Sequence, residues 1–139
     1  MLFKVYHSKD WSLNTLLHFV RNDSGYVPDS DDYEVVADVE SESLGMVFQY
    51  TNSIDDYWWN NENVNAVKTD TRSTSVGDLV EDEDGKLWLC CSSGWGEVEW
   101  LDESSDSIRK GWAFWKALHE KFNDTNAENK MNDMKEKLF

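Results

Sequence analysis

The side chains best suited to chemistry lie in one short run, Arg72-Ser73-Thr74-Ser75-Val76-Gly77-Asp78. An arginine followed by three hydroxyl groups could bind an anion, because hydroxyls and turn amides collect phosphate. The run has a single glycine, so it lacks the repeated glycines of a phosphate-binding loop. We therefore favour a structural role, in which Arg72 pairs with a carboxylate of the chain and the hydroxyls satisfy backbone groups. Gly77 permits a positive φ and Asp78 can bond its own backbone, which predicts a turn into a strand.

Histidine and cysteine show no catalytic or metal-binding pattern. His7, His18 and His119 lie far apart, and no His or Cys pair has the spacing of a zinc site. Cys90 and Cys91 are neighbours on a predicted strand, where successive side chains alternate between faces, so one thiol would lie in the core and the other outside. Nothing in the sequence indicates an activated thiolate. We predict no catalytic residue, no metal and no cofactor, and hence a protein that is not an enzyme.

Acidic residues dominate the chain and are unevenly distributed. Twenty-eight Asp and Glu stand against thirteen Lys and Arg, a formal net charge of −15. No Lys or Arg occurs between Arg21 and Lys68, whereas the balance turns basic from Arg109 onward. Such a charge repels phosphate backbones and anionic lipid, so we predict no direct nucleic-acid binding, no membrane association, and a basic partner protein. The carboxylates expected to face that partner are Asp29, Asp31, Asp32, Asp55, Asp56, Glu81, Asp82, Glu83 and Asp84.

The alternative for these acidic clusters is a solvated surface that serves only solubility. Calcium binding is a further alternative, but the loop 81–84 lacks the alternating ligands and the later glutamate of a helix-loop-helix calcium site.

Eight tryptophans in 139 residues are a second unusual feature. Stacking on single-stranded nucleic acid would require a positive groove, which this composition does not favour. Tryptophan also anchors protein interfaces, and anchors surrounded by acids suit a basic protein groove. We assign that role to Trp58, Trp59, Trp95 and Trp100. The alternative is that at least two of them lie in the core.

Hydrophobic patterning predicts an α+β fold, with a small antiparallel or mixed sheet of about five strands packed by two or three helices. Strand patterns occur at 2–6, 33–39, 64–68, 79–80, 86–91 and 97–100, with a turn at 92–96. Helices are predicted from a cap at Asp10 or Ser12 to Asn22, from a cap at Ser41 or Ser43 to about Asn52, and from a cap within 104–107 to about Phe122. The acidic loop 81–85 ends in Asp-Gly, a strong hairpin signal.

The third predicted helix has one apolar stripe that should pack on the sheet. The stripe consists of Ile108, Trp112, Trp115, Leu118 and Phe122. We predict a single acidic domain over residues 1–123, followed by a basic tail, helical or frayed, over 124–139.

Several segments between Tyr33 and Trp100 together carry a family resemblance. They are the run 34–40, Ser43-Leu44, Phe48, the run 51–55, Trp58-Trp59, Asn61, Val64, the Arg72–Asp78 run and the Cys- and Gly-containing strand after it. This pattern resembles an uncharacterised family of small acidic proteins encoded by tailed bacteriophages and some plasmids. The resemblance implies a phage accessory product acting in the host bacterial cytoplasm, and it implies no reaction.

Three functions remain open at this point. The leading hypothesis is a non-enzymatic host-takeover protein that binds and modulates a basic host protein, such as a nucleic-acid-processing enzyme or RNA polymerase. If the carboxylates are spaced like phosphates along one face, the protein would be a DNA mimic. The second is a small ligand-binding or enzymatic domain with a pocket near Arg72. The third is a structural, self-associating protein, so either a monomer or a homodimer is compatible with the sequence.

Overall fold

The chain folds around a six-stranded antiparallel sheet, and the computed structural model describes residues 1–53 and 56–138. The strands are β1 (Leu2–Ser8), β2 (Tyr33–Glu40), β3 (Val64–Ala66), β4 (Leu79–Glu81), β5 (Leu87–Cys91) and β6 (Gly94–Val98). They lie in the order β3-β2-β1-β4-β5-β6, and each neighbouring pair is antiparallel. The predicted α+β class is confirmed, with a sheet slightly larger than expected.

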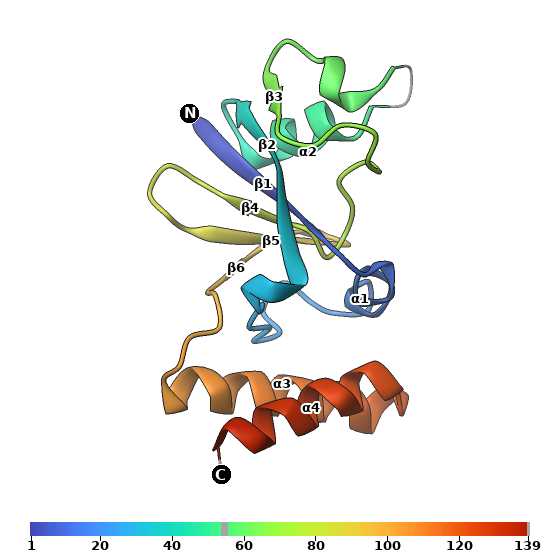
Figure 1. Ribbon diagram of the computed structural model, residues 1–139, viewed down its shortest axis with the longest axis vertical. Coiled ribbons are helices and arrows are strands. Elements are labelled where there is room, and N and C mark those ends of the chain that lie inside the picture. The colour runs from blue at the N-terminus through green and yellow to red at the C-terminus, as the bar shows by residue number, and fades with distance from the viewer. Residues whose placement is uncertain (54–55, 139) are drawn as a thin grey trace.

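Helices cover both faces of this sheet (Figure 1). Within the described residues the α-helices are α1 (Trp11–Leu17), α2 (Leu44–Thr51), α3 (Ser105–Phe122) and α4 (Thr125–Leu138), and the short 3-10 helices are η1 (Ser30–Asp32) and η2 (Trp58–Asn60). Helices α3 and α4 pack against each other below the sheet, at the opposite end of the molecule from α2.

Two hydrophobic cores result, one on each face. The larger core joins β4 and β5 to α1, α3 and α4, with Leu17, Leu79 and Leu89 almost fully buried. The smaller core joins β1 and β2 to α2 and η2, and Val47 and Trp58 supply its helical side. Because both faces are covered, successive residues of a strand can both be buried.

The predicted caps start the helices. Asp10 accepts a hydrogen bond from the backbone N–H of Ser12 at 2.9 Å, and Ser43 accepts one from Met46 at 3.2 Å. Helix α1 stops at Leu17 and not at Asn22, because the backbone then tightens to bonds between residues three apart, such as Val20 N–H to the Leu17 carbonyl.

The last strand begins earlier than predicted. Residues 92–96 were predicted as a turn, but β6 starts at Gly94, so that Gly94 pairs with Cys91 and Trp95 with Cys90. The two-residue connection Ser92-Ser93 is enough for a hairpin because Gly94 has a φ of +113°, a conformation that favours glycine.

The buried face of α3 is rotated from the predicted stripe. Ile108, Trp115 and Leu118 are buried as predicted, but Phe114 is buried as well. Trp112 is only partly buried, and Phe122 is 36 % exposed. This difference arises because α4 packs on a second side of α3. Helix α3 therefore needs a wider apolar face than a helix that packs on the sheet alone.

The segment predicted as a tail forms α4 and packs into the larger core. Ala127 and Met134 are 0 % and 3 % exposed. The predicted boundary between domain and tail, at residue 123, therefore falls between two helices that pack together in the same core. The segment is also not basic by itself. Its charged residues are Lys130, Lys135 and Lys137 against Asp124, Glu128, Asp133 and Glu136.

Candidate functional site

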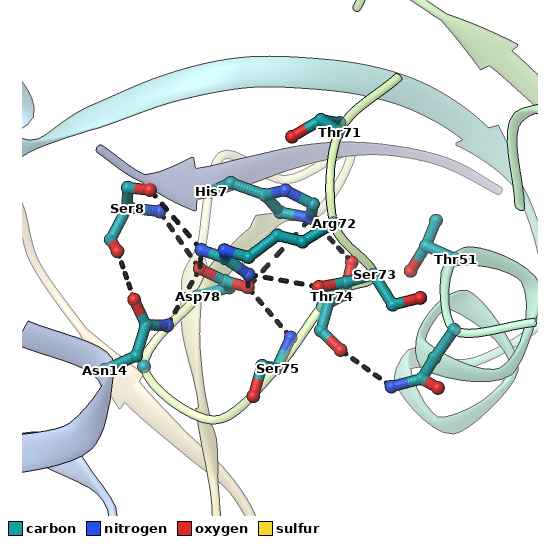
Figure 2. A network of polar contacts seen from close by, with 12 residues as sticks. His7, Ser8, Asn14, Thr51, Thr71, Arg72, Ser73, Thr74, Ser75 and Asp78 are labelled. Carbon is teal, nitrogen blue, oxygen red and sulfur yellow. Dashed lines mark hydrogen bonds and ion pairs between the residues drawn. The ribbon is translucent and has the colours of Figure 1, made fainter. Parts of the chain in front are cut away.

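Asp78 is the centre of a buried polar network beneath the loop that leads into β4 (Figure 2). Its side chain is fully buried. The carboxylate accepts hydrogen bonds from the backbone N–H groups of Ser8 and Ser75, at 2.9 and 2.8 Å, and from the Asn14 amide at 3.2 Å. The Arg72 guanidinium donates to both carboxylate oxygens, at 2.6 and 2.7 Å. The network therefore fixes the end of β1, helix α1 and the 72–78 loop relative to one another.

Arg72 is fully engaged in this network. Besides Asp78, its two terminal nitrogens donate to the carbonyl oxygens of Ser73 and Ser8, at 3.0 and 3.3 Å. The guanidinium also stands 5.0 Å from the ring centre of Trp11, within the range of a cation–π contact. Both terminal nitrogens are thus already bonded within the protein, so the geometry favours the structural interpretation of Arg72 over a phosphate site.

His7 and Thr74 come closest to a catalytic pair, with the histidine Nε2 2.9 Å from the threonine hydroxyl. Two observations argue against catalysis. The side chains are 1 % and 0 % exposed, so no substrate reaches them. Asp78 lies 3.9 Å from the same Nε2, whereas the acid of a catalytic triad would bond Nδ1, which has no hydrogen-bond partner. Burial lowers the pKa of His7 to about 4, despite the opposing effect of Asp78, and this keeps the imidazole neutral.

An open hollow of about 650 Å³ lies beside the exposed edge of Arg72. We call it the aromatic hollow. It is lined by Ser53, Asp56, Tyr57, Trp58, Trp59, Asp70, Thr71, Arg72 and Ser73. Tyr57 is 64 % exposed and stacks on Trp59, with ring centres 4.6 Å apart and planes at 11°. Asp70 has a φ of +56°, an uncommon backbone conformation for a residue other than glycine. The hollow thus combines a flat aromatic surface with two exposed carboxylates.

The structure disperses the acidic residues that were predicted to act together. One group, Asp29, Asp31 and Asp32, lies in or beside η1, at the start of β2. The loop that contains Glu83 lies near the opposite end of β2, because Glu83 accepts the backbone N–H of Leu2, which pairs with Glu40, at 2.6 Å. An eight-residue strand separates the two groups, roughly 25 Å at 3.3 Å per residue.

Several of these carboxylates are already used locally. Asp29 accepts the N–H of Asp31, and Asp32 pairs with Lys130 of α4. Asp82 organises the β4–β5 turn, and the hydrogen bond from the Trp88 indole lowers the pKa of its carboxyl. Glu81, Glu83 and Asp84 complete that end of the sheet. Asp56 belongs to the aromatic hollow, and Asp55 falls outside the described residues.

The four predicted tryptophan anchors have different environments. Trp58 is 2 % exposed, and its indole donates to the carbonyl oxygens of Thr71 and Arg72 at 3.1 Å each, so its predicted interface role is wrong. Trp100 is partly buried, with its ring 5.2 Å from that of Tyr6. Trp95 is partly buried against the smaller core, and Trp59 lines the hollow.

Sequence reasoning missed Tyr57 and Asp70 as surface residues. The signal for Tyr57 was present in the Tyr57-Trp58-Trp59 run, because a tight turn that begins at Trp58 can bury one aromatic and expose its neighbours. Asp70 is distant in sequence and has no such local signal.

The cysteines are both buried, contrary to the expectation that one would lie outside. Cys91 is part of the larger core and Cys90 lies on the other face, because helices cover both faces of the sheet. Burial raises the pKa of the Cys90 thiol to about 12 and also raises that of Cys91. Both thiols are therefore protonated and unreactive at neutral pH.

Over residues 1–53 and 56–138, no cluster of three or more His, Cys, Asp or Glu side chains is arranged to hold a metal ion. In the same part of the chain, every helix is too short or too polar to cross a membrane. Comparison of the chain with protein-family models, with curated proteins and with solved structures finds no match.

Proposed function

We propose that this chain is a non-enzymatic binding protein that docks a basic segment of a host protein in the aromatic hollow. The observation that carries the proposal is the stacked pair Tyr57–Trp59 with the exposed carboxylates of Asp56 and Asp70 in the same hollow. Arg72 also lines the hollow, but its charge is balanced by Asp78, so the site is negative where a ligand would enter.

Lysine or arginine of a partner fits this site for two physical reasons. A cation over an aromatic face gains about 0.5–1 kcal/mol when exposed and ~2 kcal/mol when water is excluded. The two carboxylates can complete its hydrogen bonds, and charge-assisted bonds are stronger than neutral ones. Over a longer range, the net charge of −15 steers a basic partner toward the molecule and repels nucleic acid.

The resemblance to phage and plasmid proteins extends the proposal to the host partner. A nucleic-acid-processing enzyme or RNA polymerase presents the basic surface that the hollow would bind, and occupation of that surface would modulate the enzyme. Mimicry of DNA is a stronger form of the proposal. It stays a prediction, because the acidic groups lie at both ends of the sheet, and competition by duplex DNA for the same partner tests it.

The test is affinity capture from bacterial lysate with tagged protein, washed at low and high salt. We expect a nucleic-acid-binding protein that is retained at low salt and lost at high salt, because exposed charge pairs are screened. Tyr57→Ala, and Asp56→Asn combined with Asp70→Asn, should each weaken its binding about tenfold, or ~1.4 kcal/mol. Asparagine tolerates the backbone conformation of Asp70, so the replacement at this position does not strain the loop.

The matched control is Glu97→Gln combined with Glu99→Gln, which removes two exposed charges at and just beyond β6, outside the aromatic hollow. Equal loss of binding in the control would show that net charge alone attracts the partner. Salt-independent retention, or full retention by Tyr57→Ala, would contradict docking in the hollow.

A small-molecule site is the second candidate, because about 650 Å³ lies within the ~300–1,000 Å³ range of ligand pockets. The same aromatic and acidic groups would select a quaternary ammonium compound. Calorimetric titration with choline tests this function. Saturable binding that Tyr57→Ala abolishes would support it, and no heat of binding would remove it.

A further inference from the structure

A second hollow, on the opposite side of the sheet, is apolar and has a basic rim. This groove has a volume of about 610 Å³ and lies between α3 and the segment that follows α1. Phe19, Val20, Ala113, Phe114, Ala117 and Leu118 form its apolar surface. Phe19 is 63 % exposed, and its ring centre lies 5.3 Å from that of Phe122, which is 36 % exposed. Large apolar side chains that remain exposed together commonly mark a binding surface.

Backbone hydrogen bonds and a buried neighbour hold Phe19 in the turn that follows α1. Its backbone N–H donates to the carbonyl of Leu16 at 3.2 Å, and that of Val20 donates to Leu17 at 3.1 Å. Val20 is itself 6 % exposed and anchors the turn in the larger core. The turn therefore presents the Phe19 ring to solvent while Val20 packs in the larger core.

The rim of the groove reverses the charge of the rest of the molecule. Arg21, Lys110 and Lys121 line it, against the single carboxylate of Asp23. These are three of only thirteen Lys and Arg in a chain with a net charge of −15. Among the described residues, the carboxylate ion pairs of lysine and arginine engage Lys68, Arg72, Lys116 and Lys130, and not the three rim cations.

We propose that this groove docks an acidic amphipathic segment of a partner protein, with apolar side chains against Phe19 and Phe114 and carboxylates on the basic rim. A helix that places its apolar face in a groove is a recurrent mode of peptide recognition. The charge on the rim selects an acidic segment over a basic one. The proposal is independent of the aromatic hollow, because the two sites share no residue.

The two acidic loops of the molecule fit the groove poorly. Residues 81–85 and 29–32 are almost entirely polar, so a second copy has no acidic segment there with apolar side chains to insert. An anionic membrane is also disfavoured, because the remaining surface is strongly negative. A separate partner of acidic, amphipathic character is the occupant that satisfies both the apolar floor and the basic rim.

Fluorescence anisotropy with a labelled peptide tests the proposal on the full chain. The probe is an amphipathic peptide with leucines at i, i+3, i+4 and i+7 and glutamates on the other face. We expect saturable binding at low salt that is weakened about tenfold by Lys110→Glu and by Phe19→Ser. Both replaced side chains are exposed, and circular dichroism confirms that the variants are folded. Lys86→Glu makes the same charge change in the distant β4–β5 turn and should leave binding unchanged.

The Asp56→Asn, Asp70→Asn double variant should also bind the peptide normally, so failure of this proposal and failure of the aromatic hollow are distinguishable. Equal binding of a scrambled acidic peptide or of a lysine version would overturn the proposal. So would equal weakening by Lys86→Glu and Lys110→Glu. A homodimer that Phe19→Ser dissociates, or binding to phosphatidylserine vesicles that Lys110→Glu abolishes, would replace the acidic partner with a second copy or a lipid surface.

Discussion

At the scale of single residues, the structure is organised by a buried charge. Asp78 accepts five hydrogen bonds, two of them from Arg72, so its desolvation is offset by paired charge and by satisfied lone pairs. The same bonds join segments that are far apart in the sequence, since Ser8 and Asn14 lie more than sixty positions away. This role explains why the most chemically suggestive run of the sequence supplies no reactive group.

Replacement of Asp78 should destabilise the fold strongly. Asp78→Asn leaves the Arg72 charge unpaired and places an amide where two backbone N–H groups need acceptors, with an expected loss of roughly 3–5 kcal/mol. Urea denaturation followed by fluorescence measures the change. Asp84→Asn removes an equal charge from an exposed turn position and should change stability by less than about 0.5 kcal/mol. Similar midpoints for the two variants would rule out the central role of Asp78.

His7 predicts a pH dependence of stability. Its pKa is about 4 in the folded protein and 6.5 in the unfolded reference, so the unfolded chain binds more protons between these values. The free energy of unfolding should therefore fall as pH drops from 6.5 to 4, by an amount on the order of 3 kcal/mol from this residue. His7→Gln should show a flatter curve over that interval, although it is less stable at pH 7. Parallel curves for the two proteins would show that carboxylates, and not His7, cause the loss.

At the scale of elements, caps and turns were predictable because their signals are local. Ser43, Ser104 and Asp10 each cap the helix that follows them, through bonds spanning only two or three residues. The start of β6 was not predictable in the same way, since β6 also depends on a contact outside its own segment. Gly96, for example, is buried where β6 passes the backbone of Asn22.

Two glycines test this distinction. A β-carbon at Gly96 would collide with the Asn22 carbonyl, so Gly96→Ala should cost about 1–3 kcal/mol through a forced backbone shift. Gly45 lies in α2 with its nearest outside atom 4.0 Å from a β-carbon position, so Gly45→Ala should stabilise by about 0.5 kcal/mol. Thermal unfolding of both variants provides the measurement. A neutral Gly96→Ala would mean that β6 does not pass close to residue 22.

At the scale of the whole molecule, α4 completes the larger core and is not an appendage. Met134 packs on α3 close to Gly111, where an added β-carbon would lie 3.3 Å from its sulfur. Met134→Ala should therefore lower the free energy of unfolding by roughly 2–5 kcal/mol. Asn132→Ala, at an exposed position of the same helix, is the control. An unchanged urea midpoint for Met134→Ala would indicate that α4 frays away from the rest.

The sequence by itself determined the α+β class, the helix caps, most of the strands and the acidic character, because periodicity, capping and charge are properties of neighbouring residues. Only the tertiary structure decided that Arg72 pairs with Asp78, that Trp58 is buried while Tyr57 is exposed, and that the acids divide between two ends of the sheet. It also brought Arg21 beside Lys110 and Lys121 around the groove. These arrangements join residues that are remote in sequence. Strand pairing and helix packing bring such residues together, and neither leaves a pattern among neighbouring residues.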